Sequence, residues 1–128
     1  MIDTVLGDIP DPSYASDINQ VVFKGSVMDE VVFYHLASKT VIFCDLIQRF
    51  PEGRGWKVWL MKVDGLVGEK GSTPREWRFN FWWNGRLDLA RAALDQVRWE
   101  WKPERLVIAH CACASRRATQ LVPDCLGL

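Results

Sequence analysis

Few residue types in this chain are able to bind a metal or activate a nucleophile. The 128 residues contain two histidines, His35 and His110, and four cysteines. The segment His110-Cys111-Ala112-Cys113 brings nitrogen and sulfur donors together, as a soft metal would need. It lacks a second cysteine or histidine pair at zinc-finger spacing, so the pattern favours a segment without a metal.

Two other candidates have a structural interpretation. Asp45 stands three residues before Gln48, the spacing of a capping box, and this predicts a short helix that begins at Asp45. His35 lies within an expected hairpin beside Tyr34, and we expect a structural role for it. Cys44 ends an apolar run and is expected to be a buried small side chain.

The elements that must position these residues begin with strands. Three runs rich in β-branched and aromatic residues predict strands at 20–24, 30–36 and 39–44. The second and third are close enough for an antiparallel hairpin. The apolar run at 106–109 predicts another short, buried strand. Because these runs are nearly continuous in apolar residues, covered sheet faces and an α/β fold are expected.

Helical periodicity is clearest over 86–101. Its apolar residues recur at spacings of three and four, at Leu87, Ala90, Leu94, Val97 and Trp101. The 56–63 segment places Trp56, Trp59, Leu60 and Val63 on one helical face, with Lys57 and Lys62 off that face.

Two further helices are expected. Thr73 as the N-cap and Pro74 at the first helical position predict a helix start. A last helix is expected over 116–122. Among the seven tryptophans most should belong to the core, but Trp82-Trp83 cannot both face inward in a regular element. Some tryptophans should therefore be exposed or covered by a partner.

Composition excludes several function classes. With 48% hydrophobic residues the chain is too apolar for disorder, and sixteen basic residues balance sixteen acidic ones. This zero net charge favours no nucleic-acid partner. No run is long enough for a membrane span, and no secretory signal is visible. We expect a cytoplasmic protein with reduced cysteines.

Several segments together carry a family resemblance. Glu30–His35 followed by Ser38–Leu46, then Thr73–Arg78 and Pro103–His110, resemble a bacterial family of metallo-β-lactamase-like proteins catalogued as a domain of unknown function. The resemblance runs from about Val21 to about His110. It implies an α/β fold of mainly antiparallel strands with flanking helices, corresponding to half of an αββα sandwich. Residues 1–18 would be an irregular lead-in, and 19–128 one partial domain.

The resemblance also implies two metal ligands. In the superfamily an aspartate after the second strand bridges two metals and a late histidine binds one of them, and Asp45 and His110 match these positions. The family's first histidine-rich motif is absent, no histidine lies near Gly25-Ser26, and Cys111 replaces the usual glycine. Because a catalytic zinc needs about three protein ligands, a complete site is not expected.

The leading hypothesis is therefore a metallo-β-lactamase-like protein that acts in binding or assembly, with no cofactor and no autonomous hydrolase activity. The alternative is a metal-dependent hydrolase, with zinc or iron, completed by another chain or by a missing N-terminal segment. Since the other half of the sandwich is absent, an apolar sheet face should be exposed or buried in a homodimer or by a missing-half partner. A third hypothesis, an interfacial membrane helix at 56–63, is weakened by its having only two lysines and by the zero net charge.

Overall fold

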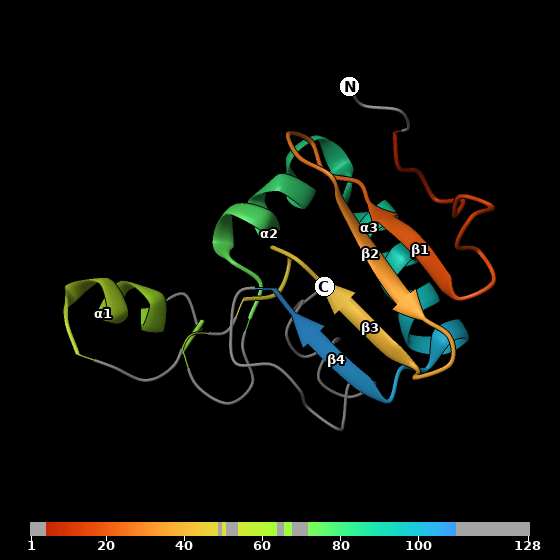
Figure 1. The fold of residues 1–128 in the computed structure, drawn as a ribbon. Helices are drawn as coiled ribbons and strands as arrows, with labels where there is room; N and C mark the ends of the chain where they lie inside the picture. Colours follow the sequence, from red (N-terminus) through yellow and green to blue (C-terminus); the bar gives the residue numbers. More distant parts are fainter. Residues whose placement is uncertain (1–4, 49, 51–53, 64–65, 68–71, 110–128) are drawn as a thin grey trace.

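A four-stranded sheet forms the centre of the computed structural model (Figure 1), which describes residues 5–48, 50, 54–63, 66–67 and 72–109. The strand order is β1-β2-β3-β4, with bounds Ile18–Phe23, Glu30–His35, Thr40–Phe43 and Arg105–Ile108. β1, β2 and β3 pair antiparallel, whereas β4 pairs parallel to β3. The predicted strands, the hairpin and the α/β class are confirmed.

The side chains on one face of the sheet are largely buried. Along β2 the side chains of Glu30, Val32 and Tyr34 are buried, and those between them are partly buried. Helix α3, Leu87–Asp95, lies behind the sheet in Figure 1 and packs on this face. Its contact residues follow the predicted periodicity, with Ala90, Ala93 and Leu94 buried, followed by Val97 and Trp101 beyond the helix end.

The predicted helix over 86–101 is helical nearly throughout, but it changes type near its end. Gln96–Trp101 forms a π-helical segment, and Lys102 then adopts a left-handed φ of 47°. The Trp101 ring stacks on Tyr34 with centroids 5.2 Å apart, and the Tyr34 hydroxyl donates to the Trp101 carbonyl oxygen at 2.8 Å. This anchoring fixes the helix end against β2 before the chain enters β4.

The opposite sheet face is less exposed than expected. Val31, Phe33, Ile42 and Val107 share this face by strand register, and each is partly buried. Residues 5–17 contain no helix or strand, whereas Ile18, the last residue of the expected lead-in, already belongs to β1, and Gly7 and Ile9 lie against the same face at Gln20. There the buried Gln20 side chain donates to the Gly7 carbonyl oxygen at 2.6 Å. The large exposed apolar side chains lie on helices and loops instead.

Helix α2, Arg75–Trp82, begins one residue later than predicted, and a short 3-10 turn, Trp83–Gly85, follows it. Pro74 is the capping residue, with an extended ψ of 149° and no side-chain capping bond. Thr73 is therefore too far from the first turn to cap it, and its buried hydroxyl has no hydrogen-bond partner in the described part of the chain. The N-terminal turn uses the Pro74 carbonyl oxygen instead, which accepts from the Trp77 and Arg78 N–H groups.

Helix α1, Trp56–Val63, matches the predicted helix. It stands apart from the sheet at the left of Figure 1, and none of its residues is buried. The predicted helix at 116–122 lies outside the described residues.

Candidate functional site

The end of β3 holds the predicted metal-ligand position, and a buried carboxylate organises it. Glu30, at the start of β2, accepts hydrogen bonds from three consecutive backbone N–H groups: Cys44 at 3.0 Å, Asp45 at 2.9 Å and Leu46 at 2.5 Å. These bonds hold residues 44–47 in a bend directly after the strand. The two carboxylate oxygens of Glu30, on the neighbouring strand β2, thus fix the backbone at Asp45.

The helix predicted to begin at Asp45 does not form. Leu46 gives its backbone N–H to Glu30, so it is held in the bend and not in a first helical turn. Gln48 does not form a capping box, because its side-chain amide donates to the Asp45 carbonyl oxygen at 3.3 Å. Its backbone pairs with Ser72 through two bonds of 3.0 Å. Long-range pairing therefore replaces the local capping pattern.

Glu30 is a buried carboxyl group in this region. Burial raises the pKa of its carboxyl above the ordinary value, the three backbone hydrogen bonds oppose this increase, and the nearby Asp45 charge adds to it. Sequence reasoning assigned Glu30 only to a strand. The signal was nevertheless present, because alternation along β2 places Glu30 on the same inward face as Val32 and Tyr34.

Cys44 differs from its expected burial. β3 ends at Phe43, whose side chain fills the core, so Cys44 falls on the bend and is exposed. Partial burial, with the charges of Asp45 and Glu30, raises the pKa of its thiol. A raised pKa disfavours the thiolate, which is the form that attacks substrates and binds metals.

The two predicted ligands are only partly placed. Asp45 lies exposed on the bend, and β4 ends at the same end of the sheet, where the Ala109 N–H donates to the Phe43 carbonyl oxygen at 3.0 Å. His110 lies outside the described residues, as does the Cys111–Cys113 segment. The predicted approach of Asp45 and His110 therefore stays a prediction.

His35 belongs to the opposite end of β2 and has a structural role there, as expected. Its Nδ1 lies 2.7 Å from the Ser38 hydroxyl, which in turn lies 2.7 Å from the Thr40 hydroxyl. These contacts hold the turn of the β2–β3 hairpin.

Among the described residues no three histidine, cysteine or acidic side chains gather as metal ligands. Because Glu30 is occupied by backbone amides, the described donors at the β3 end do not fit a complete zinc site.

Asn80 on α2 is a second buried polar residue that sequence reasoning missed. Its Oδ1 accepts from the Ser26 and Val27 N–H groups at 2.9 and 2.7 Å, and its Nδ2 donates to the Met28 carbonyl oxygen at 2.9 Å. A Cβ on Gly25 would lie 1.9 Å from the Asn80 Nδ2. Hydrogen bonds to the side-chain amide of Asn80 thus fix the conformation of the β1–β2 loop.

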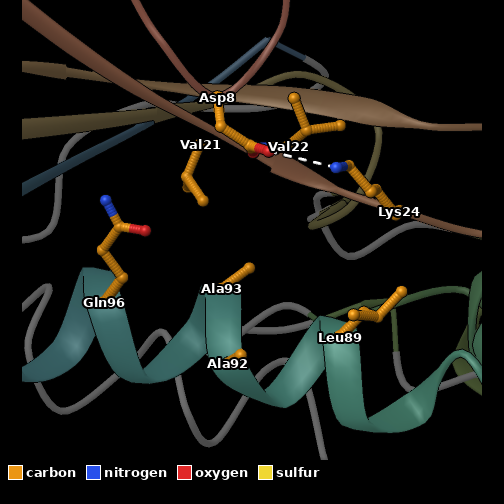
Figure 2. A pocket seen from close by; sticks show the side chains of 8 residues that line it. All are labelled: Asp8, Val21, Val22, Lys24, Leu89, Ala92, Ala93 and Gln96. Atoms are coloured by element: carbon orange, nitrogen blue, oxygen red, sulfur yellow. Dashed lines mark hydrogen bonds and ion pairs between the residues drawn. The ribbon is translucent and has the colours of Figure 1, made fainter.

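The hollow drawn in Figure 2 lies between β1 and α3 and has a volume of about 220 Å³. Its charged groups are Asp8 and Lys24, whose side chains form an ion pair of 3.1 Å. The hydrogen bond from the Val22 N–H lowers the pKa of Asp8, and Lys24 lowers it further against the effect of burial. Asp8 therefore stays ionised near neutral pH, which suits it poorly for general acid chemistry.

Exposed aromatic side chains form the remaining notable surface. Phe79, Trp82 and Trp83 cluster at the end of α2, with Phe79 ring centroids 6.2 and 5.1 Å from the two tryptophans. Trp56 and Trp59 on α1 are 70% and 63% exposed. The expectation that some tryptophans are exposed is confirmed, but the expectation that most belong to the core is wrong. Five of the seven are exposed, whereas Trp77 and Trp101 are buried.

In comparisons with known proteins, no family model, curated protein or solved structure matches this chain. Within the described part of the chain, every helix is too short or too polar to cross a membrane.

Proposed function

We propose that this chain is a metallo-β-lactamase-like domain that acts in binding or assembly and is not an autonomous metal-dependent hydrolase. The observation that carries this proposal is the position of Glu30. The Glu30 carboxylate is buried and accepts the backbone N–H groups of Cys44, Asp45 and Leu46, so it holds the bend and is not available as a metal ligand.

The donor set supports the same proposal. The chain has two histidines, and His35 is bonded to Ser38 in the β2–β3 turn, away from the bend. Asp45 and His110 would together supply two protein ligands. With two ligands a zinc ion keeps most of its coordination sphere as water and binds weakly.

The distribution of exposed apolar groups supports a binding role. The second sheet face is partly buried, whereas α1 and the end of α2 present exposed tryptophans. A partner chain, including a second copy or a missing half, would gain more apolar contact from these helices than from the sheet face.

Elemental analysis of the purified full chain, with assays on β-lactam and thioester substrates, tests this proposal. We expect substoichiometric zinc and iron and no hydrolysis above the rate without protein. His110→Ala should change neither result, and His35→Ala is the matched control for loss of an imidazole elsewhere. Stoichiometric zinc that is lost in His110→Ala alone would overturn the proposal.

A hydrolase completed by another chain is the second candidate. Its support is the parallel pairing of β3 with β4, which brings Ala109 to the end of the sheet where Asp45 lies. If this candidate holds, a co-purifying chain should restore zinc binding and hydrolysis, and Asp45→Asn should abolish both. Binding of a partner without any gain in zinc would favour the assembly role.

A further inference from the structure

The side of helix α1 that packs against the rest of the protein carries fewer apolar residues than the opposite side. At about 100° per residue, Trp56, Trp59, Leu60 and Val63 project within one narrow arc, here called the outer face of α1. These four side chains are 47–70% exposed. Val58 and Met61 project to the other side and are partly buried. The larger apolar surface of α1 therefore faces away from the protein.

Basic side chains border this outer face on both sides. At the same angular step, Lys57 and Lys62 project about 100° and about 120° from Trp56, in opposite directions around the helix. Both lysines are exposed, as is Arg54 just before the helix. Residues 54–63 contain no acidic residue; the nearest in sequence are Glu52 and Asp64. Tryptophans flanked by lysines are typical of helices that lie in a lipid interface.

The zero net charge conceals an uneven distribution along the chain. Residues 1–48 contain two basic and seven acidic residues, whereas 49–86 contain eight basic and four acidic ones. The basic stretch includes both α1 and α2. The zero net charge of the chain therefore does not argue against an anionic partner for α1, because the local charge at the outer face is positive.

A second copy of the chain fits the outer face less well. Two α1 helices packed through these faces would bring Arg54, Lys57 and Lys62 of each copy close together, with no acidic residue in 54–63 to pair with them. Like charges across an interface oppose association. An anionic lipid surface instead supplies both an apolar layer and negative charge.

We propose that α1 docks on an anionic lipid surface, with its outer face at the boundary between headgroups and acyl chains. Lys57 and Lys62 then lie at the level of the lipid phosphates. This proposal goes beyond the proposed function, since it holds or fails without regard to zinc binding at Asp45.

Co-sedimentation of the full chain with phosphatidylcholine vesicles, with and without phosphatidylglycerol, tests this proposal. We expect binding to the anionic vesicles, weaker binding to the neutral ones, and loss of binding as salt rises. Trp56→Ala with Trp59→Ala should lower the bound fraction roughly tenfold, because two large aromatic groups no longer leave water. Lys57→Glu with Lys62→Glu should abolish binding to the anionic vesicles.

Matched controls use equally exposed residues outside α1. Trp99 is 58% exposed, and the Arg91 side chain on α3 is 54% exposed. Trp99→Ala and Arg91→Glu should leave vesicle binding unchanged. Urea unfolding checks that each variant folds, and none of the altered α1 residues is buried.

Three results would overturn the proposal: no binding of the folded wild type to anionic vesicles, equal losses in the control and α1 variants, or a dimer in solution that Trp56→Ala with Trp59→Ala dissociates. The last result would assign the outer face to a second copy. Light scattering without vesicles detects it directly.

Discussion

The sheet with α3 and the helix α1 show opposite uses of apolar residues. In the first region, Phe23, Phe43 and Val97 are fully buried, and polar residues such as Glu30 are enclosed with their hydrogen bonds satisfied. In α1 no residue is buried, and its tryptophans are among the most exposed in the described part of the chain. Internal contacts thus stabilise the sheet region, whereas α1 keeps its apolar side chains available for a partner.

The largest expected effect is the difference in unfolding free energy lost when an aromatic side chain is truncated in each of these two regions. Phe43→Ala should lower the free energy of unfolding by about 3–5 kcal/mol, because a fully buried ring that packs 6.2 Å from Phe23 is replaced by a cavity. Trp59→Ala should change it by no more than about 0.5 kcal/mol, although a larger ring is removed. Urea titration measures both. Equal losses would mean that α1 is part of the folded core.

The next effect concerns the carboxylate that holds the bend after β3. Glu30→Ala should lower the free energy of unfolding by about 2–4 kcal/mol, because three backbone N–H groups lose their acceptor. Asp45→Ala, in an exposed neighbour, is the control and should cost much less. Urea titration again gives the values. If the two variants lose the same stability, Glu30 does not organise the bend.

A smaller effect is expected where the β1–β2 loop meets α2. Asn80→Ala should lower the free energy of unfolding by about 2 kcal/mol through three lost hydrogen bonds. Gly25→Ala should cost about 1–3 kcal/mol, because its Cβ would lie 1.9 Å from Asn80 Nδ2 and 2.2 Å from the Met28 carbonyl oxygen. The double variant should cost less than the sum, since one clash partner is gone. Strict additivity in this cycle would show that the two residues do not interact.

The smallest effect is a pH dependence of stability. Burial, the main cause, raises the pKa of Glu30 in the folded chain above its usual 4.5. The folded state then binds more protons than the unfolded state between 4.5 and the raised pKa, so the contribution of Glu30 to stability is present below this window and is lost as pH rises through it.

Unfolding of wild type and Glu30→Gln across the acid range measures this dependence. The difference in unfolding free energy, wild type minus variant, should decrease as pH rises from about 4.5 and then level off. A difference that instead grows with pH would mean that the three backbone hydrogen bonds outweigh burial at Glu30.

Local patterns predicted the sheet region well and α1 only in part. Its β-branched and aromatic content located β2, and the spacing of Ala90, Leu94 and Val97 located the helix that covers the buried face. Periodicity also located α1. It shows that this helix has an apolar face, but it does not show which surface covers that face.

The candidate site was harder to predict because its bonds join distant parts of the chain. Asp45 and Gln48 have capping-box spacing, yet Glu30 holds the backbone fifteen residues away in sequence from Asp45. Asn80 reaches a loop more than fifty residues earlier in the chain. Neither partner can be identified from local spacing, although the inward position of Glu30 on β2 was visible in the alternation.

The most direct test of a binding role without an autonomous metal site is a zinc titration of the full chain in competition with a chromophoric chelator. We predict weak binding that does not reach one zinc per chain when the chelator is in excess, with no further loss in Asp45→Asn. Tight binding of one or more zinc ions per chain, weakened by Asp45→Asn and by His110→Ala, would contradict it.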